Sequence, residues 1–195
     1  MATEIITIIV AGIITNNIVL NQSIGICPFL GVSKKIQSGV GMGMAVTFVL
    51  AVSAVVCYFL YHYILVPLGI EYLQTITFIL IIAALVQMLD IVLKKTSPAL
   101  YTSHGVYLAL ITTNCAVLFT ANYGITQNYD LLYTFINAVC VGLGFTLALI
   151  LMAGIRERLE RADIPKAFRG FPIALIIAGI MSLAFTGFTG LSFGG

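Results

Sequence analysis

The sequence predicts an all-α integral membrane protein with six transmembrane segments. The segments are expected to form two inverted three-helix repeats, with segments 1 and 4 broken. Three observations lead to this prediction. Charged residues make up only 8% of the chain, whereas soluble domains carry about 25%. Several apolar runs are long enough to cross a bilayer as helices. Short motifs also recur in the same order in the two halves of the chain.

The composition excludes a water-soluble domain, because 61% of the 195 residues are hydrophobic and the mean hydropathy is +1.12. A spanning helix needs about 20 mostly apolar residues. Strands of a membrane barrel would be half as long and would alternate in polarity. Little chain remains for a soluble catalytic domain, so we expect a single membrane domain over residues 1–195. Its six predicted spans are roughly residues 5–27, 38–62, 72–93, 99–121, 131–154 and 171–191.

The basic residues predict the orientation of these spans. All of them follow spans 1, 3 and 5, whereas the opposite connections carry only acidic charge. By the positive-inside rule, the basic loops face the cytoplasm and both termini face outward. We therefore expect a multi-pass protein of the cytoplasmic (inner) membrane of a prokaryote. Acidic residues are interleaved in the last basic loop, so we interpret it as a topology signal and expect no nucleic-acid partner. The basic residues are Lys34, Lys35, Lys94, Lys95, Arg156, Arg158, Arg161, Lys166 and Arg169.

Three motif pairs indicate an internal duplication. "TNNIVL" at 15–20 matches "TNCAVL" at 113–118, "VGMGM" at 40–44 matches "VGLGF" at 141–145, and "LIIA" occurs at both 80–83 and 175–178. We place repeat 1 at about residues 1–95 and repeat 2 at about 96–195. Because each repeat has three spans, the second must enter the membrane from the opposite side. We also expect the glycine pairs 41/43 and 142/144 to let spans 2 and 5 pack closely.

Polar residues interrupt the two spans that the duplication relates, spans 1 and 4. Gly25 permits a left-handed backbone and Pro28 lacks an N–H group, so both favour a break in span 1. Thr and Asn side chains, as in "TTN" at 112–114, can satisfy the backbone groups that a broken helix releases. Such residues can also simply join neighbouring helices. Their occurrence in both related spans favours a site near the middle of the membrane.

The four cysteines divide into two pairs. Cys57 and Cys140 lie among apolar residues, and we interpret them as small buried side chains. Cys27 and Cys115 lie beside the polar interruptions. Iron–sulfur clusters and structural zinc usually take four protein ligands. If Cys27 and Cys115 bind metal, a second chain of the same architecture is the obvious source of the remaining ligands.

Several segments resemble the A subunits of the Rnf complex, an ion-translocating ferredoxin:NAD oxidoreductase. They include "GICPFLGVSKK", "LITTNCAVL", "DIPKAFRG" and "AGIMSLAFTGFTG". The homologous E subunit of the sodium-pumping NADH:quinone oxidoreductase is the nearest alternative, but "GVSKK" together with "TTNCAVL" fits the Rnf version better. The resemblance covers nearly the whole chain. It implies an electron-transfer subunit of a translocase, with no catalysis expected from the isolated chain.

The resemblance also implies a cofactor and partners. Family members are expected to share a [2Fe–2S] cluster in the membrane with the homologous Rnf E subunit, which has the opposite topology. Each chain would give two cysteines, and Cys27 and Cys115 match those positions. The backbone around Gly25 and Ile26, and the side chains of Thr113 and Asn114, are candidate hydrogen-bond donors around the cluster. Further implied partners are the B, C, D and G subunits of Rnf and membrane lipid. The chain has no SGAT-like flavinylation motif, so we expect no covalent flavin.

A secondary transporter is the alternative function, because inverted repeats with broken helices also serve transport. A transporter would be expected to carry an ionisable coupling group inside the membrane. The only acidic residue inside a predicted span is Asp90, four residues before Lys94 and near the end of span 3. This spacing is typical of a solvated ion pair on a helix surface. The residues therefore favour electron transfer.

Overall fold

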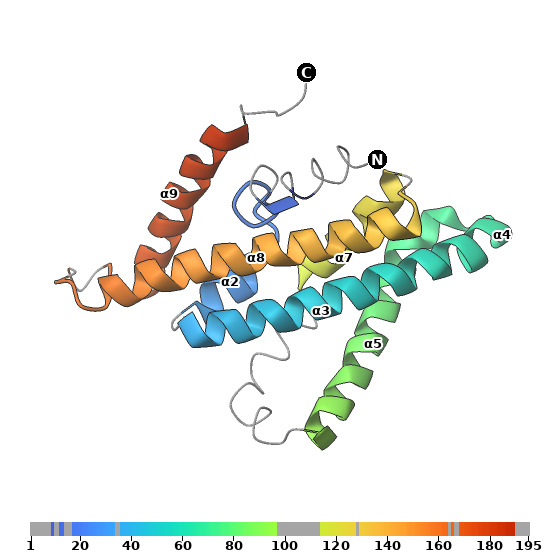
Figure 1. Ribbon diagram of the computed structural model, residues 1–195, viewed down its shortest axis with the longest axis horizontal. Helices are drawn as coiled ribbons and strands as arrows, with labels where there is room; N and C mark the ends of the chain where they lie inside the picture. The colour runs from blue at the N-terminus through green and yellow to red at the C-terminus, as the bar shows by residue number, and fades with distance from the viewer. Residues whose placement is uncertain are drawn as a thin grey trace. The chain divides into compact units, whose positions relative to one another are not determined.

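Every regular element in the described part of the chain is a helix, as the sequence predicts (Figure 1). The structure, a computed structural model, describes residues 9, 12–13, 17–33, 36–96, 114–127, 129–163, 165 and 168–189. The chain divides into two units, one from Met1–Thr47 with Cys140–Gly195 and the other from Phe48–Val139. The long helices α3 (Ile36–Leu60) and α8 (Leu131–Leu159) each contribute to both units.

The first unit contains the interrupted N-terminal segment. Residues 17–25 run in turns, and the short helix α2 (Ile26–Val32) follows them. The start of α3, the end of α8 and the helix α9 (Phe171–Thr189) complete this unit. The last turn of α8 carries Arg156 and Arg158, so the apolar helix ends in basic residues.

The second unit contains the remainder of α3 and the start of α8. A π-helical turn (Tyr61–Leu65) and the short α4 (Val66–Leu68) extend α3 without a break, to Gly69 in the left-handed conformation. A 3₁₀ turn (Glu71–Leu73), α5 (Gln74–Thr96) and α7 (Cys115–Thr126) follow. The predicted second span therefore ends too early, at residue 62. Pro67 does not stop the helix, because the wider π-helical turn directly before it relaxes the hydrogen-bond ladder that proline disrupts.

The helices have the length and surface of membrane elements. The continuous helix Ile36–Leu68 has 33 residues and α8 has 29, and both are apolar enough to cross a bilayer. Helices α3, α5, α8 and α9 coincide with the predicted spans 2, 3, 5 and 6. Large apolar side chains face outward on them, for example Leu80 on α5, which is 70% exposed, and Leu183 on α9, which is 76% exposed. Such surfaces are suited to lipid or to a protein partner.

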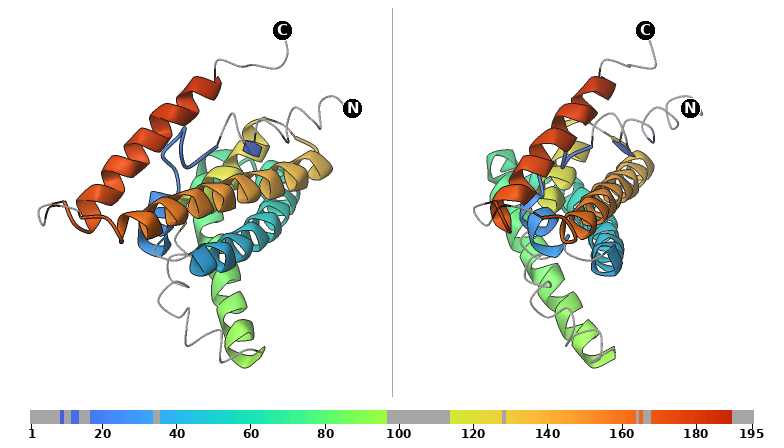
Figure 2. Two further views of the ribbon diagram at one scale, coloured as in Figure 1. Left: turned by 60° about the vertical axis from the view of Figure 1, so that its left-hand side comes forward. Right: turned by 90° about the vertical axis from the view of Figure 1, so that its left-hand side faces the viewer.

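Within the first unit, α3 and α8 cross at two glycines (Figure 2). A Cβ atom added to Gly43 would lie 2.5 Å from Cγ2 of Thr146, and one added to Gly142 would lie 2.7 Å from Cγ2 of Thr47. The contact is therefore reciprocal, with a Gly-x-x-x-Thr motif on each helix, and it requires the two helices to run antiparallel. This confirms the expected close packing at Gly43 and Gly142, whereas Gly41 is exposed.

Candidate metal centre

Cys27 lies in the first turn of α2 and its side chain is exposed. The helix begins there because Gly25, at φ 82° and ψ 24°, reverses the chain in the left-handed conformation, as the sequence predicts. Pro28 is the third residue of the helix, where a missing backbone N–H costs no helical hydrogen bond. Pro28 and Phe29 are buried and fix the inner face of this turn, while Cys27 lies on its outer side.

A fully buried amide, Asn17, holds the turns that precede α2. Its Oδ1 accepts hydrogen bonds from the backbone N–H groups of Val19 at 3.1 Å and Leu20 at 3.4 Å. Its Nδ2 donates to the carbonyl of Gly144 on α8 at 2.8 Å. The backbones can come this close because Gly144 has no side chain: a Cβ atom there would lie 2.7 Å from the Gly12 carbonyl. Asn17 thus supplies bonds that a continuous helix would otherwise make.

The other end of α2 is held by Arg156 on α8. Its Nη1 donates to the Leu30 carbonyl at 2.8 Å and to Ser33 Oγ at 3.0 Å, at the C-terminus of α2. Ser182 on α9 donates to the carbonyl of Leu20 at 2.6 Å. The segment that carries Cys27 is therefore fixed at both ends. Sequence reasoning treated Arg156 only as a topology signal and missed this role.

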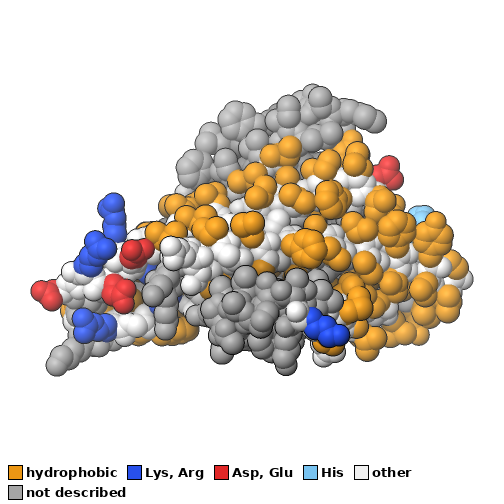
Figure 3. Space-filling model, turned by 60° about the horizontal axis from the view of Figure 1, so that its bottom comes forward, with side chains coloured by type: hydrophobic (Ala, Val, Ile, Leu, Met, Phe, Trp, Pro, Cys, Tyr) orange, Lys and Arg blue, Asp and Glu red, His pale blue; other side chains and the backbone are white. Residues whose placement is uncertain are grey.

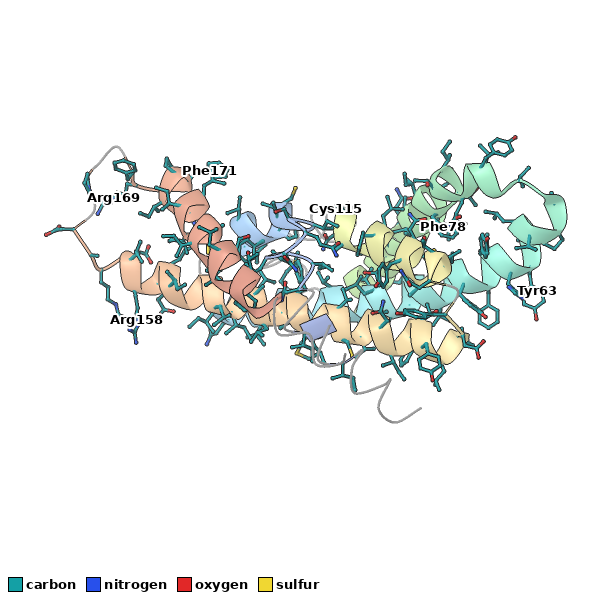
Figure 4. All side chains as sticks on the ribbon, turned by 90° about the horizontal axis from the view of Figure 1, so that it is seen from above. Tyr63, Phe78, Cys115, Arg158, Arg169 and Phe171 are labelled. Atoms are coloured by element: carbon teal, nitrogen blue, oxygen red, sulfur yellow. The ribbon has the colours of Figure 1, made fainter. Side chains whose placement is uncertain are left out.

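In the second unit, Cys115 is the first residue of α7 and its side chain is exposed (Figure 4). Asn114 precedes it with extended backbone angles, φ −72° and ψ 115°, and its Oδ1 accepts a hydrogen bond from Ala116 N at 3.1 Å. This is an N-cap, the usual way to satisfy a free amide at a helix start. Asn114 is only 4% exposed, yet its Nδ2 has no hydrogen-bond partner within the described residues. Thr113, the other candidate donor, lies outside the residues that the structure describes.

The remaining two cysteines are buried, which confirms the interpretation of them as small packed side chains. Cys57 is 0% exposed and Cys140 is 5% exposed. The Cβ of Cys140 lies 3.1 Å from the place where a Cβ on Gly12 would be. The four thiols thus separate by exposure into the same two pairs that the sequence separates by their neighbours.

The structure does not bring a complete set of metal ligands together. Cys27 belongs to the first unit and Cys115 to the second, so each is described within its own unit. No group of three or more His, Cys, Asp or Glu side chains able to hold a metal ion occurs among the described residues. Joint ligation of one cluster by Cys27 and Cys115 stays a prediction.

Residues 5–192 match the family of Rnf-Nqr subunits, which are membrane proteins. The chain belongs to the Rnf-Nqr family. The A subunit of the Na(+)-translocating ferredoxin:NAD(+) oxidoreductase complex of Acetobacterium woodii is 55% identical to it over 190 residues, or 97% of this chain and 99% of that protein. The A subunits of the ion-translocating oxidoreductase complexes of Aliivibrio salmonicida and Vibrio cholerae are each 50% identical over 189 residues, 97% of this chain and 98% of theirs. These names agree with the resemblance to the Rnf version rather than with the NADH:quinone alternative.

Proposed function

We propose that this Rnf-Nqr protein is the A subunit of an ion-translocating oxidoreductase complex of the Rnf type, and that it carries electrons through the membrane. Family membership and near-complete coverage by A subunits of such complexes support the first part. The second part rests on one observation. Of the four thiols, only the two in the first turns of α2 and α7 are exposed, and a partner chain could reach them there.

Cys27 and Cys115 fit the ligand chemistry of an iron–sulfur cluster. Thiolates are the soft ligands that such clusters take, and four are usual. We propose that these two provide half of the ligands of a [2Fe–2S] cluster and that the homologous E subunit provides the other half. When bound, the cluster supplies a one-electron relay inside the membrane. Because the hydrocarbon core is about 30 Å thick, a relay inside it shortens each electron transfer.

Asn114 is suited to act on such a cluster. A buried N–H group without a partner costs about 1–3 kcal/mol, and the Nδ2 of Asn114 has none among the described residues. Its neighbour in the chain, Cys115, carries the thiol that would become a ligand. A hydrogen bond from Nδ2 to a sulfur of the site would satisfy the amide. It would also stabilise the more negative, reduced cluster and so raise the reduction potential. The backbone at Gly25 and Ile26 is the corresponding candidate beside Cys27.

An inverted repeat is the architecture that we propose around this site. The Gly43–Thr146 and Gly142–Thr47 contacts have the reciprocity of a two-fold axis crossing α3 and α8. Each unit contains one short helix that starts beside an exposed cysteine, parts of α3 and α8, and one further long helix, as a duplication would give. We further propose that the basic loops are cytoplasmic and both termini outside, from the charge distribution alone.

The test is iron content and electron flow in the purified complex. Cys27→Ser or Cys115→Ser should remove the iron of one cluster, because a hydroxyl is a poor ligand for a soft iron site. Ferredoxin-driven NAD reduction should fall sharply in both variants.

Cys57→Ser and Cys140→Ser are the matched controls, and they should keep both the iron and the electron flow apart from a modest loss of stability. If all four variants behave alike, or if Cys115→Ser keeps full iron, the cluster assignment is wrong. The transporter hypothesis would then be the better one.

A further inference from the structure

The end of α8 and the start of α9 line an open cavity of about 410 Å³ in the first unit. Its lining combines two guanidinium groups, of Arg156 and Arg169, with one carboxylate, of Glu160, and with apolar side chains. Figure 3 shows basic and acidic side chains gathered at the left of the view, where α8 ends in Figure 1. The lining residues are Arg156, Leu159, Glu160, Arg169, Gly170, Ile173 and Ile177.

The two arginines have hydrogen-bonding capacity to spare. Arg156 uses only Nη1 to hold the end of α2, so Nε and Nη2 remain for another acceptor. Arg169 is exposed. Neither arginine forms an ion pair with an acidic side chain in the part of the chain that the structure describes. Two guanidiniums around one opening are suited to a phosphate group, which arginine binds through paired N–H donors.

The apolar part of the lining points to a lipid rather than to a free anion. Leu159, Ile173 and Ile177 form one wall, and Gly170, at φ 101°, leaves the rim without a side chain. Phe168 and Phe171 flank Arg169 and are 48% and 63% exposed, and Figure 4 shows Phe171 beside Arg169 at the start of α9. The site thus lies where the apolar spans end and the charged loop begins, which is the depth of phospholipid headgroups.

We propose that this cavity binds the phosphodiester of a bilayer phospholipid, with Arg156 and Arg169 on the phosphate and the apolar wall against the upper acyl chain. Glu160 sits on the same rim and is suited to a headgroup hydroxyl or ammonium. The proposal does not depend on the cluster. The bound lipid would contact Arg156, which also holds α2, the helix that carries Cys27.

Arg169 is the residue to change, because Arg156 also holds α2. The purified complex is washed free of lipid, titrated with palmitoyl-oleoyl-phosphatidylglycerol in detergent micelles, and the retained lipid is counted by mass spectrometry. Arg169→Gln should weaken binding roughly tenfold, the effect of losing one charged hydrogen bond. Arg169→Lys should keep part of the affinity, since it keeps the charge.

Arg158→Gln is the matched control, because Arg158 lies in the last turn of α8, outside the lining, and points away from α9 in Figure 4. It should bind like the unchanged protein, and millimolar inorganic phosphate should not displace the lipid. Equal losses in Arg158→Gln and Arg169→Gln would mean only diffuse surface charge, and displacement by phosphate would mean a free-anion site. A crosslinker at position 169 that captures an acidic segment of a different protein in the complex instead of lipid would also overturn the proposal.

Discussion

The crossing of α3 and α8 gives the sharpest prediction about packing, through Gly43→Ala. A Cβ atom at position 43 would lie 2.5 Å from both Cγ2 and Oγ1 of Thr146 and 2.8 Å from its Cβ. Rotating the threonine cannot relieve the contact, because its Cβ does not move when χ1 changes. The helices must separate instead, and overpacking of this kind costs about 1–3 kcal/mol.

Gly154→Ala on α8 is the matched control, because nothing lies within 4 Å of its added Cβ. Both substitutions gain the same helix propensity, about 0.5–1 kcal/mol, so the difference between them isolates the overpacking. At about 2–4 °C per kcal/mol for a chain of this size, Gly43→Ala should melt roughly 2–12 °C below Gly154→Ala. The measurement is the fraction of complex that survives heating, read by size-exclusion chromatography.

A second substitution tests the reciprocity of the contact. Thr146→Gly in the Gly43→Ala background moves the glycine from one helix to the other and should restore most of the stability. Gly142→Ala with Thr47→Gly should be rescued less, because a Cβ atom at position 142 would still lie 2.8 Å from the backbone Cα of residue 47. If Gly43→Ala has the same melting temperature as Gly154→Ala, or if Thr146→Gly does not restore stability, then α3 and α8 do not cross as described.

Three further predictions concern the interrupted segments and the orientation. Asn17→Leu should lower stability by about 1–3 kcal/mol, since it removes the bond to the Gly144 carbonyl and leaves the buried Val19 N–H without its acceptor. Gln22 is exposed, so Gln22→Leu should not lower it. Equal melting temperatures of the two variants would contradict the role given to Asn17. Asn114→Gly removes the amide donor at an N-cap position that tolerates glycine, so redox titration followed by electron paramagnetic resonance should find a lower cluster potential. An unchanged potential would show that Nδ2 does not donate to a sulfur. A single cysteine at position 160 should react with impermeant maleimide only after the cells are opened, and labelling from outside would reverse the topology.

The sequence predicts α3, α5, α8 and α9 well, because the corresponding spans are continuous apolar runs that must satisfy their own backbone groups in lipid. The prediction fails at the end of span 2, where the helix continues to Leu68 through a π-helical turn. Hydrophobicity carries no sign of that turn. The sequence also does not predict the role of Arg156. A basic residue after a span looks the same in the sequence whether it faces solvent or holds a neighbouring helix. Its contact with Leu30 joins residues 126 positions apart.

The duplication stays a prediction, and the register that the sequence predicts for it differs from that of the glycine contacts. The glycine motifs align at an offset of 101 in the sequence, pairing Gly43 with Gly144. The packing instead makes Gly43 the counterpart of Gly142, and Thr47 that of Thr146. The difference of two residues arises because each segment has glycines two positions apart, and a sequence match cannot tell which of them meets the opposite helix. The structure separates them, because Gly43 has no room for a Cβ atom, whereas Gly41 is exposed.

Asn17 and Asn114 accept the same kind of backbone hydrogen bond but differ in the hydrogen bonds that their Nδ2 groups donate. This difference connects the fold to the proposed chemistry. In each, an asparagine Oδ1 accepts a hydrogen bond from the backbone N–H two residues later, Val19 for Asn17 and Ala116 for Asn114. The Nδ2 of Asn17 donates to two carbonyls, those of Gly144 and Ile13. The Nδ2 of Asn114 is buried without such a bond among the described residues. Among the described residues, a buried amide donor without a partner thus lies directly before an exposed thiol. We propose that a sulfur of the cluster is the acceptor, because a hydrogen bond to it would remove the cost of burying that donor unpaired.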